Sequence, residues 1–140
     1  MTLIVNLISW VGRNTYAVLT VVIAAAMFYL ELYPFKFRVP VNGHGALRKL
    51  LETWADRPQL GDFIRNVIAY MALSFCATMA LGNHDGRPRW ALVVVLVGAT
   101  SSISFELMQY FIPGRYTSAM DVYADTLGLI IGSSAAVLSD

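Results

Sequence analysis

The chain has 140 residues, of which 57% are hydrophobic and only 14% are charged. A soluble domain of this size usually carries about a quarter charged residues, so the composition excludes an ordinary soluble core. The net charge of +1 leaves no dense basic face to neutralise phosphates, which argues against a nucleic-acid partner. We therefore expect an all-α integral membrane protein that forms a single domain over residues 1–140.

Four apolar stretches are long enough to cross the hydrocarbon as helices, which takes about 20 residues. They cover residues 15–33, 63–81, 90–111 and 120–138. Residues 1–13 are apolar but interrupted by polar side chains, and they lack the basic start of a cleavable signal peptide, so we expect an interfacial lead-in. The resulting four-transmembrane-helix bundle has both termini on one side of the membrane.

The long loop after the first span contains a short amphipathic helix, expected over residues 45–56. Leu47, Leu50, Leu51 and Trp54 fall at i, i+3, i+4 and i+7 and form one apolar face. This face either lies on the membrane surface, with Trp54 at headgroup depth, or packs on the spans. Either arrangement places the helix over the polar ends of the spans, where it could act as a lid.

Polar side chains gather where the last three spans reach one side of the membrane. They are Asp62 and Asn66 in the second span, Glu106 and Gln109 in the third, Arg115 in the following turn, and Asp121 and Asp125 in the fourth. Within each helix, a spacing of three or four residues places the two side chains on one face. Because charges near hydrocarbon are costly, we expect a polar pocket just below the interface, with these as its ligand-binding residues.

Several of these residues also have structural explanations. Asp62 can cap the second span, and Ser118-x-x-Asp121 fits a capping box. Asp121 and Asp125 are like charges four residues apart, which destabilises a helix unless a cation intervenes. Arg115 can supply that cation through a bidentate contact. A structural ion-pair network therefore stays an alternative to a binding site.

The residue types also bear on chemistry. Carboxylates together with the amide oxygens of Asn66 and Gln109 would suit Mg²⁺ or Ca²⁺, but no motif requires a metal, and we expect neither metal nor cofactor. His44 and His84 fall in loops on opposite membrane faces, which argues against a zinc centre or a histidine-based hydrolase. If the protein is an enzyme, Glu106 is the candidate catalytic residue, acting in proton transfer.

Three motifs carry a family resemblance. They are Asp62-x-x-x-Asn66, Glu106-x-x-Gln109-Tyr-Phe-x-Pro-x-Arg115, and Asp121-x-x-x-Asp125-Thr-x-Gly128-x-x-x-Gly132. Through them the chain resembles the VanZ-like family of small four-span bacterial membrane proteins, over roughly residues 30–135. Two departures stand out: the family usually has Asn at position 125, and its usual Phe-x-Pro-Leu-Gly run is replaced here by residues 70–74.

The resemblance implies a multi-pass protein of the bacterial inner membrane, linked to tolerance of glycopeptides such as teicoplanin, with no established reaction. We favour an accessory or binding role, in which Arg115 takes an anionic group and the carboxylates take amines or hydroxyls. The alternatives are a structural subunit of a larger membrane complex and an enzyme acting on a lipid-linked substrate. Expected partners are membrane lipids, a lipid-linked cell-wall component or glycopeptide, and a larger complex. Sidedness stays open, because a basic surface helix can bind headgroups on either face.

Overall fold

The computed structural model describes residues 14–41, 43, 45–82 and 86–139. Within these residues every regular element is a helix. They are α2 (Thr15–Leu32), α3 (Ala46–Glu52), the 3-10 helix η1 (Thr53–Ala55), α4 (Leu60–Leu81), α5 (Arg87–Gln109) and α6 (Ala119–Leu138). The predicted lead-in at residues 1–13 lies outside the described residues.

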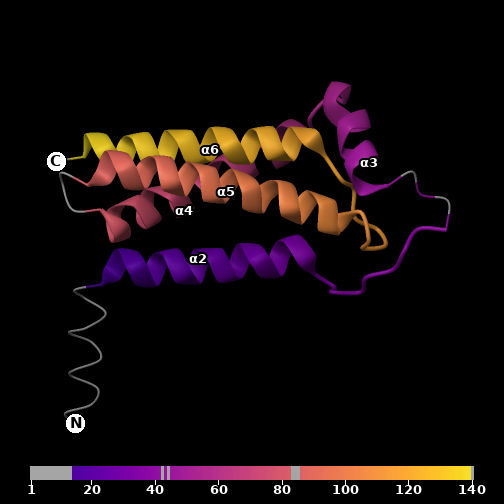
Figure 1. Cartoon of the computed structure of the whole chain (residues 1–140), viewed down its shortest axis with the longest axis horizontal. Coiled ribbons are helices and arrows are strands. Elements are labelled where there is room, and N and C mark those ends of the chain that lie inside the picture. The colour runs from indigo at the N-terminus through magenta and orange to yellow at the C-terminus, as the bar shows by residue number, and fades with distance from the viewer. Residues whose placement is uncertain (1–13, 42, 44, 83–85, 140) are drawn as a thin grey trace, which may run out of the picture.

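The four long helices α2, α4, α5 and α6 are each long and apolar enough to cross a membrane, which confirms the predicted fold class. Figure 1 shows them lying side by side, with α3 running across one end of the bundle. Helix α4 begins at Leu60, three residues before the predicted start, because Gly61 and Asp62 already belong to its first turn. Helix α5 begins at Arg87 and has a proline in its first turn, where the missing N–H would have no partner.

Helix α6 is the most buried of the four long helices and packs most extensively on α4 and then on α5. A side chain at Gly128 would collide with the carbonyl oxygen of Val67, and one at Gly132 with the carbonyl oxygen of Met71. The two glycines therefore allow the backbones of α4 and α6 to approach closely, as small residues spaced by four do in transmembrane helices.

Polar side chains join the same two helices within the core. The Thr78 hydroxyl donates to Ser133 Oγ at 3.3 Å, and the Ser74 hydroxyl lies 3.5 Å from the Gly128 carbonyl oxygen. Ser74, Thr78 and Ser133 are buried. Hydrogen bonds between helices in hydrocarbon contribute about 0.6 kcal/mol on average, so these support the close packing without dominating it.

Helix α2 is held more loosely than the others. It packs mainly on α4 and less on α5, and its buried residues are Met27 and Leu32. Met27 joins Tyr70 and Leu129 in the small apolar core. The rest of α2 presents large apolar side chains outward, as expected of a helix that is surrounded by lipid on most sides.

Helix α3 and η1 attach to the bundle through Leu50 and Thr53, which are buried. Leu47, Leu51 and Trp54 are instead between 60% and 64% exposed. Most of the predicted apolar face is therefore not packed on the spans. Its exposure favours the alternative in which this face contacts the membrane surface.

Thr53 joins η1 to the first turn of α6. Its hydroxyl accepts a hydrogen bond from the Ala119 backbone N–H at 3.0 Å and donates to the Leu50 carbonyl oxygen at 2.7 Å. Thr53→Val leaves the Ala119 N–H unpaired, whereas the Leu50 carbonyl oxygen still accepts from the Thr53 backbone N–H. We therefore expect the substitution to cost about 1–3 kcal/mol and to lower the melting temperature in detergent. Thr100→Val is the control, since that hydroxyl bonds to Leu96 in its own helix and is exposed. Equal melting temperatures of the two variants would contradict this attachment.

Candidate functional site

A cavity of about 1010 Å³ lies at the end of the bundle where α2 and α5 finish and α4 and α6 begin. Of the predicted binding residues, the cavity is lined by Asp62, Asn66, Gln109, Arg115 and Asp121. Its remaining polar lining includes Glu31, Asp56, Arg57, Gln59, Arg65, Tyr116 and Ser118, and its apolar lining includes Met27, Leu30, Ala69 and Tyr70. Glu106 and Asp125 do not line it.

The turn between α5 and α6 positions Arg115. Ile112 is buried at 2% exposure and anchors the turn, and Gly114 adopts a φ of 84° that L side chains rarely adopt. The Arg115 backbone N–H donates to the Ile112 carbonyl oxygen at 3.1 Å and closes the turn. The guanidinium is thereby directed toward the end of α2.

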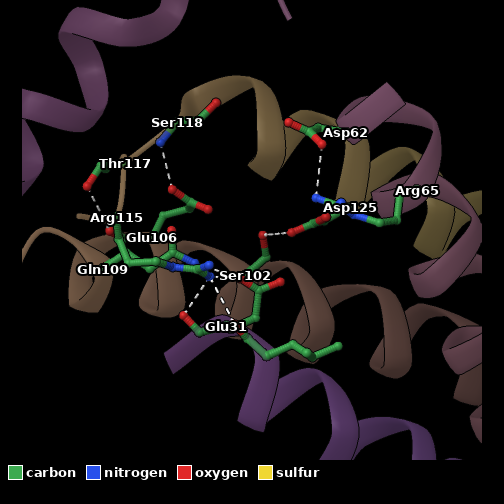
Figure 2. A network of polar contacts seen from close by, with 11 residues as sticks. Glu31, Asp62, Arg65, Ser102, Glu106, Gln109, Arg115, Thr117, Ser118 and Asp125 are labelled. Atoms are coloured by element: carbon green, nitrogen blue, oxygen red, sulfur yellow. Dashed lines mark hydrogen bonds and ion pairs between the residues drawn. The ribbon is translucent and has the colours of Figure 1, made fainter. Parts of the chain in front are cut away.

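Arg115 binds the C-terminal turn of α2. Its Nη2 donates to the backbone carbonyl oxygens of Leu30 and Glu31, at 3.1 and 2.8 Å, and forms an ion pair with Glu31 Oε2 at 3.4 Å. The Gln109 amide donates to the same Glu31 oxygen at 2.6 Å, and Figure 2 shows the three side chains meeting. A cation at this position satisfies carbonyl groups that a helix end leaves unpaired and complements the helix dipole.

The Arg115 pairing differs from the structural alternative, in which its guanidinium would be the cation between Asp121 and Asp125. The ion pair that the structure shows for Arg115 is with Glu31, which lies 84 residues away along the chain. No spacing rule connects two such distant positions. The available signal for Glu31 is a lone carboxylate in the last turn of an otherwise apolar span, a feature that usually has a partner.

Glu106 is buried at 3% exposure and joins the end of α5 to the start of α6. Its Oε2 accepts a hydrogen bond from the Ser118 backbone N–H at 2.6 Å (Figure 2). The Ser118 hydroxyl accepts from the Asp121 backbone N–H at 3.2 Å, which is one half of the predicted capping box. The other half assigns the Ser118 N–H to the Asp121 side chain, but this N–H donates to Glu106 instead. In this arrangement Glu106 positions the turn, and its carboxylate does not reach the cavity lining.

Asp125 is also buried at 3% exposure, and it lies deeper in the bundle. Its Oδ2 accepts a hydrogen bond from the Ser102 hydroxyl at 2.6 Å (Figure 2). Its Oδ1 is buried and has no hydrogen-bond partner within the described part of the chain. Tyr70, which lines the cavity, lies next to this carboxylate. Asp125 therefore belongs to the α4–α5–α6 contact rather than to the cavity surface.

Asp62 forms an ion pair with Arg65 at 3.0 Å, with side chains 48% and 73% exposed. Exposed pairs of this kind contribute little to stability. The N-cap of α4 is Gln59, so Asp62 does not cap the helix as one alternative predicted. It lies instead in the first turn, where the helix dipole favours a carboxylate.

Tyr116 and Asp56 connect the rim of the cavity to the segment containing α3. The Tyr116 hydroxyl donates to Asp56 Oδ2 at 2.6 Å, and Lys49 Nζ lies 5.5 Å from the centre of the Tyr116 ring. The hydrogen bond to Asp56 raises the pKa of Tyr116, so the phenol stays protonated and remains a donor at neutral pH. This contact holds the α3 segment beside the cavity mouth, the position expected of a lid.

The charged groups lining the cavity are four carboxylates and three guanidinium groups. Glu31 and Asp62 are in ion pairs, and Asp56 accepts from Tyr116. Asp121 and Arg57 form no ion pair with any residue that the structure describes. In the same residues, no group of three or more His, Cys, Asp or Glu side chains could hold a metal ion. The cavity therefore offers a ligand one carboxylate and one guanidinium that are not already paired.

Comparison with known protein families identifies the family of the chain. Residues 2–139 match the family described as VanZ/LLP1. No curated protein and no solved structure matches the chain. The family match covers all four long helices and every candidate site residue, and it supports a link to glycopeptide resistance. The chain is therefore a multi-pass bacterial membrane protein that belongs to the VanZ-like family.

Proposed function

We propose that this protein is an accessory binding protein of the bacterial inner membrane, and that its cavity binds a polar group at the bilayer surface during tolerance of glycopeptide antibiotics. The observation that carries the proposal is the cavity itself, which collects polar side chains from all four long helices at one membrane surface. Family membership supports the connection to glycopeptides. Ligand pockets commonly lie between helices of bundles and combine an apolar lining with a few polar groups.

The geometry favours binding over catalysis. A general acid or base must come within hydrogen-bond reach of the proton that it transfers. Glu106, the candidate for this role, is buried, accepts a hydrogen bond from the Ser118 backbone N–H and does not line the cavity. Asp121 does line it, forms no ion pair within the described part of the chain, and is suited to holding an amine or a hydroxyl group.

The proposal predicts which variants lose function in cells. In a deletion strain complemented with the gene, we expect Asp121→Asn to restore less teicoplanin tolerance than the wild type, because it removes the cavity carboxylate that forms no ion pair with any described residue. The Asp121 backbone N–H that bonds to Ser118 is retained in this variant. Arg89→Gln is the control, since Arg89 is exposed and does not line the cavity. The measurement is the minimal inhibitory concentration, normalised to the amount of protein in the membrane.

The same strains separate the alternatives. Full tolerance with Asp121→Asn at normal abundance would overturn the binding role of the cavity. A lipid species that accumulates both in the deletion strain and with Glu106→Gln would support an enzyme instead. Recovery of the protein in mild detergent at fixed stoichiometry with a larger membrane complex would support a structural subunit.

A further inference from the structure

We propose that the ligand of this cavity is a zwitterionic glycerophospholipid with a primary ammonium, whose headgroup occupies the polar end while an acyl chain lies between α2 and α4. This inference rests on the proposed function, since it names the ligand class of the same site. Two features carry it independently. One is the change from polar to apolar lining with depth. The other is the presence of a carboxylate and a guanidinium, Asp121 and Arg57, that form no ion pair among the residues the structure describes.

The lining becomes apolar toward the bilayer centre on both walls. On α2, Glu31 lies at the polar end, and Met27 lies about 6 Å deeper by the rise of the helix. On α4, Asp62 lies at the polar end, and Ala69 and Tyr70 lie about 10–12 Å deeper. The polar ends of α2 and α4 meet at one membrane surface, so the two gradients run in the same direction. A fully polar, water-soluble ligand would gain no free energy from contact with these apolar residues, whereas an acyl chain gains free energy by burying its surface against them.

The wall formed by α2 and α4 also reaches the outside of the bundle. Leu30 lines the cavity and is 65% exposed, and the Arg65 side chain lines it and is 73% exposed. Leu30 lies in the last turn of a membrane-spanning helix, so its outer side faces the region where headgroups meet acyl chains. The cavity is therefore accessible from the lipid side between these two helices.

Asp121 and Arg57 determine which headgroup chemistry the cavity can bind. Asp121 can accept hydrogen bonds from a primary ammonium, and Arg57 can donate to a phosphate. The Asn66 amide also lines the cavity and has no hydrogen-bond partner among the described residues, so it can bind phosphate or glycerol oxygens. An anionic lipid without an amine would pair with Arg57 but would leave Asp121 beside a second negative charge. A headgroup that carries both charges satisfies both side chains.

Lipid binding to the delipidated full-length protein in detergent tests the inference, with bound molecules counted by native mass spectrometry. The probes are phosphatidylethanolamine, phosphatidylglycerol with the same acyl chains, and glycerophosphoethanolamine, which has the headgroup without chains. We expect one tightly bound phosphatidylethanolamine, weaker phosphatidylglycerol and no bound glycerophosphoethanolamine. Asp121→Asn and Arg57→Gln should each weaken the phosphatidylethanolamine complex by about tenfold, while Arg89→Gln should not.

Filling the apolar floor tests the position of the acyl chain. Ala69→Leu should reduce phosphatidylethanolamine binding because Ala69 lines the cavity, whereas Ala72→Leu on the exposed side of α4 should leave it unchanged. Melting temperatures of both variants show whether the fold is retained. If Ala69→Leu does not fold, the charge variants still decide the headgroup.

Three other binding results would each overturn a different part of the inference. Equal binding of both lipids, unaffected by Asp121→Asn and Arg57→Gln, would show nonspecific lipid around the bundle. Tight binding of glycerophosphoethanolamine that Asp121→Asn abolishes would remove the acyl chain from the inference but leave the cavity as a binding site. Absence of bound phosphatidylethanolamine, in a protein whose cavity variants still lose teicoplanin tolerance, would overturn the lipid and keep the proposed function.

Discussion

Gly132→Ala is expected to lower the free energy of unfolding by about 1–3 kcal/mol, with a lower melting temperature in detergent. The added methyl group would collide with the Met71 carbonyl oxygen and with Ser74 Oγ. A carbonyl oxygen within a helix cannot move by itself, so α4 and α6 would have to separate. That separation would also weaken the hydrogen bond between Thr78 and Ser133.

Two other glycines provide graded controls. At Gly61 no atom lies within 4 Å of an added methyl group, and alanine is the better helix former by up to about 1 kcal/mol, so Gly61→Ala should be neutral or stabilising. At Gly98 the methyl group would meet the Leu129 side chain, which can change rotamer, so a smaller loss is expected than at Gly132. A Gly132→Ala protein with the same melting temperature as the wild type would contradict the close contact of α4 and α6.

Arg115→Ala is expected to cost about 2 kcal/mol and to destabilise the protein more than Arg89→Ala. The substitution leaves the Glu31 carboxylate without its ion-pair partner, and it also removes the donor to the Leu30 and Glu31 carbonyl oxygens. The side chains of Arg115 and Glu31 are 33% and 21% exposed, so the loss should fall below that of a fully buried pair. Thermal melting in detergent at low salt measures the difference.

A double-mutant cycle identifies the partner of Arg115. Combining Arg115→Ala with Glu31→Gln should show a coupling free energy of about 1 kcal/mol, because the two side chains are in contact. Combining Arg115→Ala with Asp121→Asn should be closer to additive, since no ion pair joins them in the described structure. The reverse result would place the guanidinium beside Asp121, as in the structural ion-pair alternative.

The Arg115 contacts also change which arginine is expected to bind an anionic group of the ligand. The sequence assigns Arg115 to an anionic group of the ligand, yet this side chain is engaged by the end of α2. Arg57 at the rim is the cavity guanidinium that forms no ion pair in the part of the chain described here. We therefore expect phosphate recognition to depend on Arg57. The position of the α2 C-terminus is instead expected to depend on Arg115.

Glu106 and Asp125 show that residue spacing along a helix does not identify the hydrogen-bond partner of a buried carboxylate. Both were predicted to lie in the polar pocket with Arg115, because each shares a helix face with another polar side chain near the same end of the bundle. In the structure, Glu106 accepts from the Ser118 backbone N–H and Asp125 accepts from the Ser102 hydroxyl. A buried carboxylate binds the nearest donor, and the rotation of each helix about its axis decides which donor is nearest.

The sequence by itself determined the four spans, their common polar end and the spacing of Gly128 and Gly132 within the last span. These follow from the thickness of the bilayer and from the periodicity of a helix, both of which act locally along the chain. Only the tertiary structure decided that Arg115 binds Glu31 and that Glu106 and Asp125 lie outside the cavity. It also decided that Asp121 and Arg57 form no ion pair with any other described residue. Those outcomes depend on the relative rotation and tilt of separate helices, which packing of the whole bundle sets and no spacing along one helix records.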